Sequence, residues 1–160
     1  MKNNFLRKKR NNFKKFILKP KIVKLKILPE NKIAWFAIST RLRSHIFIWN
    51  LNKTIDIQLV KGDDFFFSPP KSATPIAFEN YEFFCEERQI SFRLISNNSE
   101  NGALVSKLKN YEFILQVVYP QNYKPITILR TKIRSIPQVL TAIELPLTDY
   151  PLLEKFSLSL

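Results

Sequence analysis

Residues 34–50 read AWFAISTRLRSHIFIWN, and this stretch decides which fold the rest of the sequence supports. Its large apolar residues recur every three or four positions, which is the spacing of one face of an α-helix. The members of this stripe are Trp35, Ile38, Leu42, Ile46 and Trp49. Neither Gly nor Pro occurs between residues 30 and 61. The spacing therefore predicts a helix over residues 34–50 with its stripe facing the core.

The alternative for part of this stretch is a strand over HIFIW, residues 45–49, because Ile and Phe favour sheets. The length of the stripe favours the helix, and Arg41 and Arg43 fall on its opposite side. His45, the only histidine, then lies about 100° from Ile46, the next stripe residue along the chain, at the margin of the stripe. We therefore interpret His45 as a boundary residue and not as a catalytic one.

Residues 76–96 have the pattern of a β-hairpin, since apolar and polar residues alternate on both sides of a turn at Glu87–Arg88. The register that satisfies both faces at once pairs Tyr81 with Leu94, Phe83 with Phe92, and Cys85 with Ile90 on the apolar face. It also places Glu82 opposite Arg93 on the polar face. This register predicts that Cys85 is a buried hairpin residue and not a nucleophile.

Shorter patterns predict the elements before and after this hairpin. Residues 21–28, KIVKLKIL, alternate and predict a half-buried strand that ends at Pro29. Residues 53–60 predict a last helical turn followed by a short strand, and residues 61–75 predict a turn, a short apolar stretch and a Pro-rich loop. Residues 103–111 predict a short helix after the loop at 96–102.

The C-terminal third adds a strand, a helix and a strand. Residues 112–119 predict a central strand, because both of its faces are apolar. Pro125 suits the start of a helix whose stripe is Ile126, Leu129, Ile133 and Ile136. Residues 138–145 predict a strand with Val139, Thr141, Ile143 and Leu145 on one face. The Leu and Phe residues after position 145 indicate that the end of the chain packs on the domain.

The order of these elements predicts the α+β class. A strand and a long helix are followed by antiparallel strands, a short helix, a strand, a helix and a strand. This order predicts an antiparallel-rich sheet with two main helices packed on one face. The length of 160 residues suits one such domain.

Basic residues are concentrated at the N-terminus. The formal charge is +13, yet residues 1–26 hold eleven basic residues and no acidic residue, so the rest of the chain is close to neutral. We therefore predict a basic arm over residues 1–20 and one domain over residues 21–160. The arm residues expected to contact nucleic acid or an anionic membrane surface are Arg7, Lys8, Lys9, Arg10, Lys14, Lys15 and Lys19. A solvated tail without a ligand explains the same composition and is the favoured interpretation.

No catalytic, metal-binding or cofactor-binding residue is predicted. One histidine and one cysteine cannot supply the usual structural zinc ligands. The adjacent carboxylates Asp63–Asp64 and Glu86–Glu87 are weak candidates for a catalytic pair, and we interpret them as solvated turn charges. A single cysteine, with no apolar run of membrane-spanning length and no secretory signal, predicts a cytoplasmic protein.

Three segments together resemble a bacterial family named for the pattern IPExxxVDY. They are RLRSHIFIWNLNKTIDIQLVKGDDF at residues 41–65, ENYEFFCEERQISFRLISN at residues 79–97 and ILRTKIRSIPQVLTAIEL at residues 128–145. The resemblance covers roughly residues 21–160 and depends on the helix predicted at residues 34–50. Asn110–Tyr111 stands where the family has Asp-Tyr, and the Ile-Pro-Glu part has no counterpart there. The family comprises small uncharacterised proteins, so the resemblance implies a fold and a bacterial cytoplasm but no activity.

These observations lead to a hypothesis and its alternatives. The leading hypothesis is a non-enzymatic interaction or adaptor domain with a protein partner. Nucleic-acid binding through the basic arm is the first alternative, and attachment of the arm to a membrane surface is the second. An enzyme whose carboxylates meet only in the folded chain is a further one.

Overall fold

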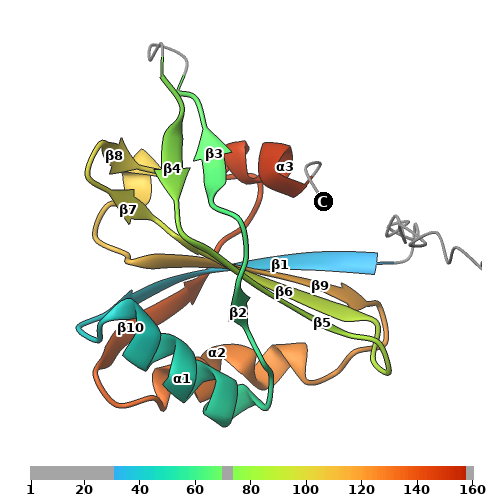
Figure 1. The fold of residues 1–160 in the computed structure, drawn as a ribbon. Coiled ribbons are helices and arrows are strands. Elements are labelled where there is room, and N and C mark those ends of the chain that lie inside the picture. The colour runs from blue at the N-terminus through green and yellow to red at the C-terminus, as the bar shows by residue number, and fades with distance from the viewer. Residues whose placement is uncertain (1–30, 70–73, 158–160) are drawn as a thin grey trace, which may run out of the picture.

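The computed structural model describes residues 31–69 and 74–157, and Figure 1 shows their arrangement. The predicted arm, residues 1–20, and the predicted strand at residues 21–28 lie outside the described residues. The described part of the chain contains a six-stranded antiparallel sheet in the order β10-β1-β9-β6-β5-β2. Its strands are β1 (Asn31–Thr40), β2 (Val60–Lys61), β5 (Asn80–Cys85), β6 (Ile90–Ser96), β9 (Phe113–Pro120) and β10 (Val139–Glu144).

The two faces of this sheet carry different layers (Figure 1). The helices α1 (Ser44–Ile55) and α2 (Ile126–Arg134) cover one face, which we call the helix face. The other face, called here the loop face, is covered by short elements. These are β3 (Phe65–Phe67), β4 (Ile76–Phe78), β7 (Asn98–Ser99), β8 (Gly102–Ala103), the 3₁₀ turn η1 (Ser106–Leu108) and α3 (Leu152–Ser157). The predicted α+β class, with two main helices on one face, is confirmed.

The predicted helix over residues 34–50 is wrong in its first half. Residues 31–40 form β1, and a helix begins only at Ser44. Every residue from Ala34 to Thr40 is buried, because layers cover both faces of this strand. In a strand that is apolar at every position, some apolar residues always fall three or four positions apart. Trp35 and Ile38 therefore fit the spacing of a helical stripe although they lie in a strand. The strand ends where the Thr40 hydroxyl accepts a hydrogen bond from the Leu42 amide at 3.1 Å.

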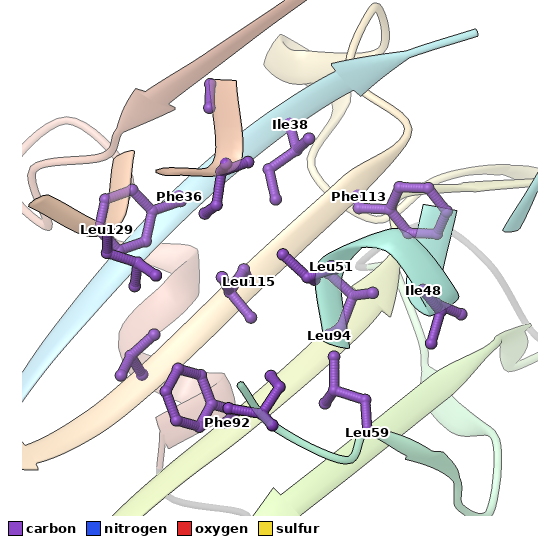
Figure 2. Packing of buried hydrophobic residues seen from close by; sticks show 14 of the residues in the cluster. Phe36, Ile38, Ile48, Leu51, Leu59, Phe92, Leu94, Phe113, Leu115 and Leu129 are labelled. Atoms are coloured by element: carbon purple, nitrogen blue, oxygen red, sulfur yellow. The ribbon is translucent and has the colours of Figure 1, made fainter. Parts of the chain in front are cut away.

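The predicted orientation of the second half is also wrong. Phe47, Ile48 and Leu51 are the buried residues of α1, whereas Trp49 is 62% exposed and Ile46 is 40% exposed. Figure 2 shows Ile48 and Leu51 among the core side chains over β6 and β9. The buried stripe is thus rotated by more than a quarter turn from the predicted one. His45, predicted at the margin of the stripe, is exposed.

The predicted hairpin register is confirmed in every pair. Cys85 lies opposite Ile90, and the turn comprises residues 86–89. Two details differ from the prediction. Cys85 is half-buried, not buried, and on the polar face Arg93 is buried although Glu82 is exposed. Arg93 is 8% exposed because β3 covers it, with the guanidinium 5.1 Å from the centre of the Phe65 ring.

The C-terminal third follows the prediction with one exception. β9 lies third in the sheet and is buried over Phe113–Val118, and α2 buries the predicted residues Leu129 and Ile133. The exception is β10, where a register shift opposite Ser39–Thr40 breaks the alternation. Val139 therefore packs on the helix face, whereas Ile143 packs on the loop face. Leu153 and Phe156 of α3 are buried on the loop face, so the C-terminal segment packs as predicted.

Candidate interaction surface

The seven arm residues predicted to contact a polyanion lie outside the described residues. The predicted acidic pairs are not brought together into a site. Asp64 forms an ion pair with Lys61 at 3.7 Å, and Glu86 and Glu87 are exposed in the hairpin turn. Across residues 31–69 and 74–157, no three acidic, histidine or cysteine side chains are grouped closely enough to bind a metal ion. None of the described helices combines the length and the apolar character needed to cross a membrane.

Positive charge is concentrated on the helix layer, defined here as residues 41–56 and 124–135. These two segments contain α1, α2 and their flanking turns. They hold seven exposed basic residues and a single acidic residue, Asp56, which gives the layer a formal charge of +6. The basic residues are Arg41, Arg43, Lys53, Lys124, Arg130, Lys132 and Arg134.

The remaining described residues have the opposite balance. They hold seven basic and eleven acidic residues, a formal charge of −4. Two of those bases are paired with acids, because Lys61 lies 3.3 Å from Glu79 and Arg93 lies 3.5 Å from Glu82. A domain that is close to neutral in total is thus polarised, and a charge separation of this kind orients a charged partner as it approaches.

The outer ridge of α1 adds apolar surface to this positive layer. Ile46, Trp49 and Lys53 follow one another at helical spacing on the side opposite the buried residues. The Lys53 ammonium lies 5.2 Å from the centre of the Trp49 ring, a cation–π contact that leaves much of the indole exposed. On α2, Ile128 is 49% exposed. An exposed aromatic ring beside cations can stack on a planar group of an anionic partner.

A second surface feature lies at the outer edge of the sheet. β2 pairs only with Tyr81 and Glu82, so β5 continues past it toward the hairpin turn. Beside this continuation is a groove of about 370 Å³ between Asp56–Gln58 and Phe83–Glu87. It adjoins a smaller cavity of about 190 Å³ that is lined on its inner side by Ile90, Phe92 and Tyr123.

Several side chains near Glu79, which directly precedes β5, have shifted pKa values. A hydrogen bond from Lys61 to Glu79, together with the negative charge of Glu79, raises the pKa of Lys61. Burial raises the pKa of Tyr81, and the charge of Glu79 raises it further. Burial lowers the pKa of Arg93, and the charge of Glu82 opposes that change.

The helix layer was missed in the sequence for a specific reason. The bases are spread over two segments about 80 residues apart, and only the packing of α1 and α2 on one face brings them into one layer. Trp49 was missed because its helix was given the wrong phase. The spacing of Phe47, Ile48, Leu51 and Ile55 carried the correct phase, had the helix been started at Ser44. No protein-family model matches the chain, and no curated protein matches its sequence.

Proposed function

We propose that this chain is a non-enzymatic interaction domain whose partner is a nucleic acid, bound by the helix layer together with the basic N-terminal residues. The observation that carries this proposal is the charge separation, with seven exposed bases and one acid on the helix layer. Phosphate contacts supply most of the affinity of non-specific nucleic-acid binding, and a layer of separate cations suits such contacts.

The outer ridge of α1 favours single strands within this proposal. An exposed indole offers a face on which an unpaired base can stack, with a contribution of about 1–3 kcal/mol per base. Trp49 is the one exposed tryptophan among the described residues, because Trp35 is fully buried. Binding of a single strand is therefore expected to quench the fluorescence of Trp49.

The proposal extends to location and family. We place the protein in the bacterial cytoplasm and with the IPExxxVDY proteins, as the resemblance implies. The succession of α1, the β5–β6 hairpin, α2 and β10 supports that placement. The part of the resemblance that relied on a helix before residue 41 has no support, since those residues form β1.

The test compares two triple variants of equal charge in the full chain. R130Q/K132Q/R134Q removes three bases from the helix layer, and K107Q/K109Q/K155Q removes three exposed bases from the loop face. Labelled single-stranded DNA and RNA are titrated against each protein at several salt concentrations. The helix-layer variant is expected to bind about tenfold more weakly and to lower the salt slope by about 2, at roughly 0.7 per lost phosphate contact.

Three outcomes separate the alternatives. Equal weakening by both variants would mean that total charge, not the helix layer, drives binding. No binding by the unmodified chain would remove nucleic acid as the partner. Sedimentation with anionic vesicles but not with nucleic acid would instead favour membrane-surface attachment, in which Trp49 and Ile128 insert at the interface.

A further inference from the structure

The open end of β5 is a second site, which shares only Asp56 with the helix layer. Within the described residues, no strand lies beside Phe83, Phe84 and Cys85 on the side away from β6. The backbone N–H and C=O groups on such an edge are available to an added strand. β2 already occupies the neighbouring positions, so an added strand would continue the ladder that β2 begins.

The groove beside this edge has chemistry of its own. On the helix face it offers the apolar side chains of Ile57 and Phe83 and the half-buried Cys85. Asp56, Glu86 and Glu87 supply three carboxylates, and the only basic residue in the adjoining cavity is Arg88. The groove therefore fits an extended segment with apolar residues at every second position and basic residues between them.

One segment of this chain has that pattern. Residues 21–28 read KIVKLKIL, with Val23, Leu25 and Ile27 alternating with Lys24 and Lys26. No acidic residue occurs before Glu30. With the three apolar residues over Ile57 and Phe83, the two lysines would lie on the opposite face, which carries Glu82 and Phe84 of β5 and is followed by Glu86 at the start of the turn.

The position of β1 decides which copy supplies the segment. Asn31 begins β1, which is separated from β5 by β9 and β6. A strand added outside β5 would lie four inter-strand spacings from β1, or about 19 Å. Leu28 is three residues before Asn31, and three residues of extended chain span at most about 11 Å. The whole segment therefore cannot reach the β5 edge of its own chain.

We propose that residues 21–28 of a second copy of this chain bind the open edge of β5 as an added strand. The result is self-association through exchanged N-terminal segments, in which main-chain hydrogen bonds give affinity and the lysine–glutamate contacts set the register. Cys85, the single cysteine, lies in the groove and becomes covered when the segment binds.

The first test uses Cys85 as a reporter in the full chain. The rate of its reaction with a disulfide reagent and the mass from sedimentation equilibrium are measured over a range of protein concentrations. We expect the mass to rise toward a dimer and the reaction to slow as concentration increases. The variant V23K/L25K/I27K is expected to stay monomeric with a constant reaction rate. The matched control L6K/F13K/I17K makes the same three-residue change to lysine within residues 1–20, and it should still associate.

A charge exchange tests the register of the contact. E86K/E87K and K24E/K26E are each expected to weaken self-association by about tenfold, whereas their equimolar mixture should associate again because the charges are complementary. Glu86 and Glu87 are exposed, and Lys24 and Lys26 lie outside the described residues. The proposal is overturned if the unmodified chain stays monomeric at its highest soluble concentration. It is also overturned if V23K/L25K/I27K associates as the unmodified chain does, or if the mixture fails to recover.

Discussion

The two faces of the sheet are held by different kinds of interaction. On the helix face, α1 and α2 cover an apolar cluster, and Phe47 of α1 stacks on Phe113 of β9 with ring centres 4.9 Å apart. On the loop face, short elements cover a second apolar cluster, and the described part of the chain also buries polar side chains. Asn97 and Gln116 are two of the three buried side-chain amides among the described residues, and the third is Asn80. Helices and long strands pair their own backbone groups, so burial of apolar surface is enough to hold them in place. Irregular segments also need specific hydrogen bonds for their buried backbone groups.

The two amides on the loop side are in opposite situations. Asn97 donates to the Leu108 carbonyl at 2.7 Å and accepts from the Val105 amide at 2.9 Å, so it fixes the segment around η1. Gln116 lies in a row across the sheet, between Trp35 on β1 and Arg93 on β6. Among the described residues, neither polar atom of the Gln116 amide has a hydrogen-bond partner.

The largest effect is expected on the helix face, for Leu51→Ala. Leu51 is fully buried between α1 and the sheet (Figure 2), so the substitution should lower the free energy of unfolding by about 3–5 kcal/mol. Trp49→Ala, two positions earlier on the same helix, should change it by less than about 0.5 kcal/mol because the ring is exposed. Urea denaturation of both variants measures the difference. The reverse order of effects would restore the stripe that the sequence predicted.

This contrast also explains how much of the fold could be predicted. β5 and α2 were predictable because each buries mainly one face, so the alternation around Phe83 and the spacing of Leu129 report the local structure. β1 has two buried faces, and its continuous apolar run from Ala34 to Ile38 carries no period. Apolar spacing therefore does not predict the secondary structure of a segment that is buried on all sides.

The candidate sites were less predictable for a related reason. The helix layer depends on α1 and α2 meeting on one face, and the groove depends on how far β2 extends along β5. Neither relation is local in sequence. The basic character of residues 1–26 is visible from composition, whereas Glu86 and Glu87 in the sequence indicate only turn charges.

An intermediate effect, of opposite sign at the two amides, is expected on the loop side. Asn97→Ala should lower the free energy of unfolding by about 2–4 kcal/mol, because it leaves buried backbone groups without partners. Gln116→Met keeps the volume and removes two unpartnered polar atoms, so it should raise the free energy of unfolding by about 1 kcal/mol.

Urea denaturation at neutral pH measures both amide variants, and Asn101→Ala is the control for an exposed amide in the same segment. If Gln116→Met proves as destabilising as Asn97→Ala, then Gln116 is hydrogen-bonded in solution. Buried polar groups would then be hydrogen-bonded on both faces, and the faces would differ only in the partners that these groups use.

The smallest effect is expected where the two faces meet, at Tyr81 on the edge of β5. Its ring packs beside the helix-face cluster, and its hydroxyl donates a hydrogen bond to Glu79 at 3.3 Å. Because burial and the charge of Glu79 raise the pKa of Tyr81 in the folded state, the neutral phenol stabilises the fold. That stability is complete below the unfolded pKa of 10.0 and is lost as pH rises through the folded pKa.

Tyr81→Phe should therefore lose less stability than the parent between neutral pH and pH values above 10.0. Glu79→Gln should lower the midpoint of the Tyr81 titration, followed by phenolate absorbance, and an unchanged midpoint would mean that burial alone sets the pKa.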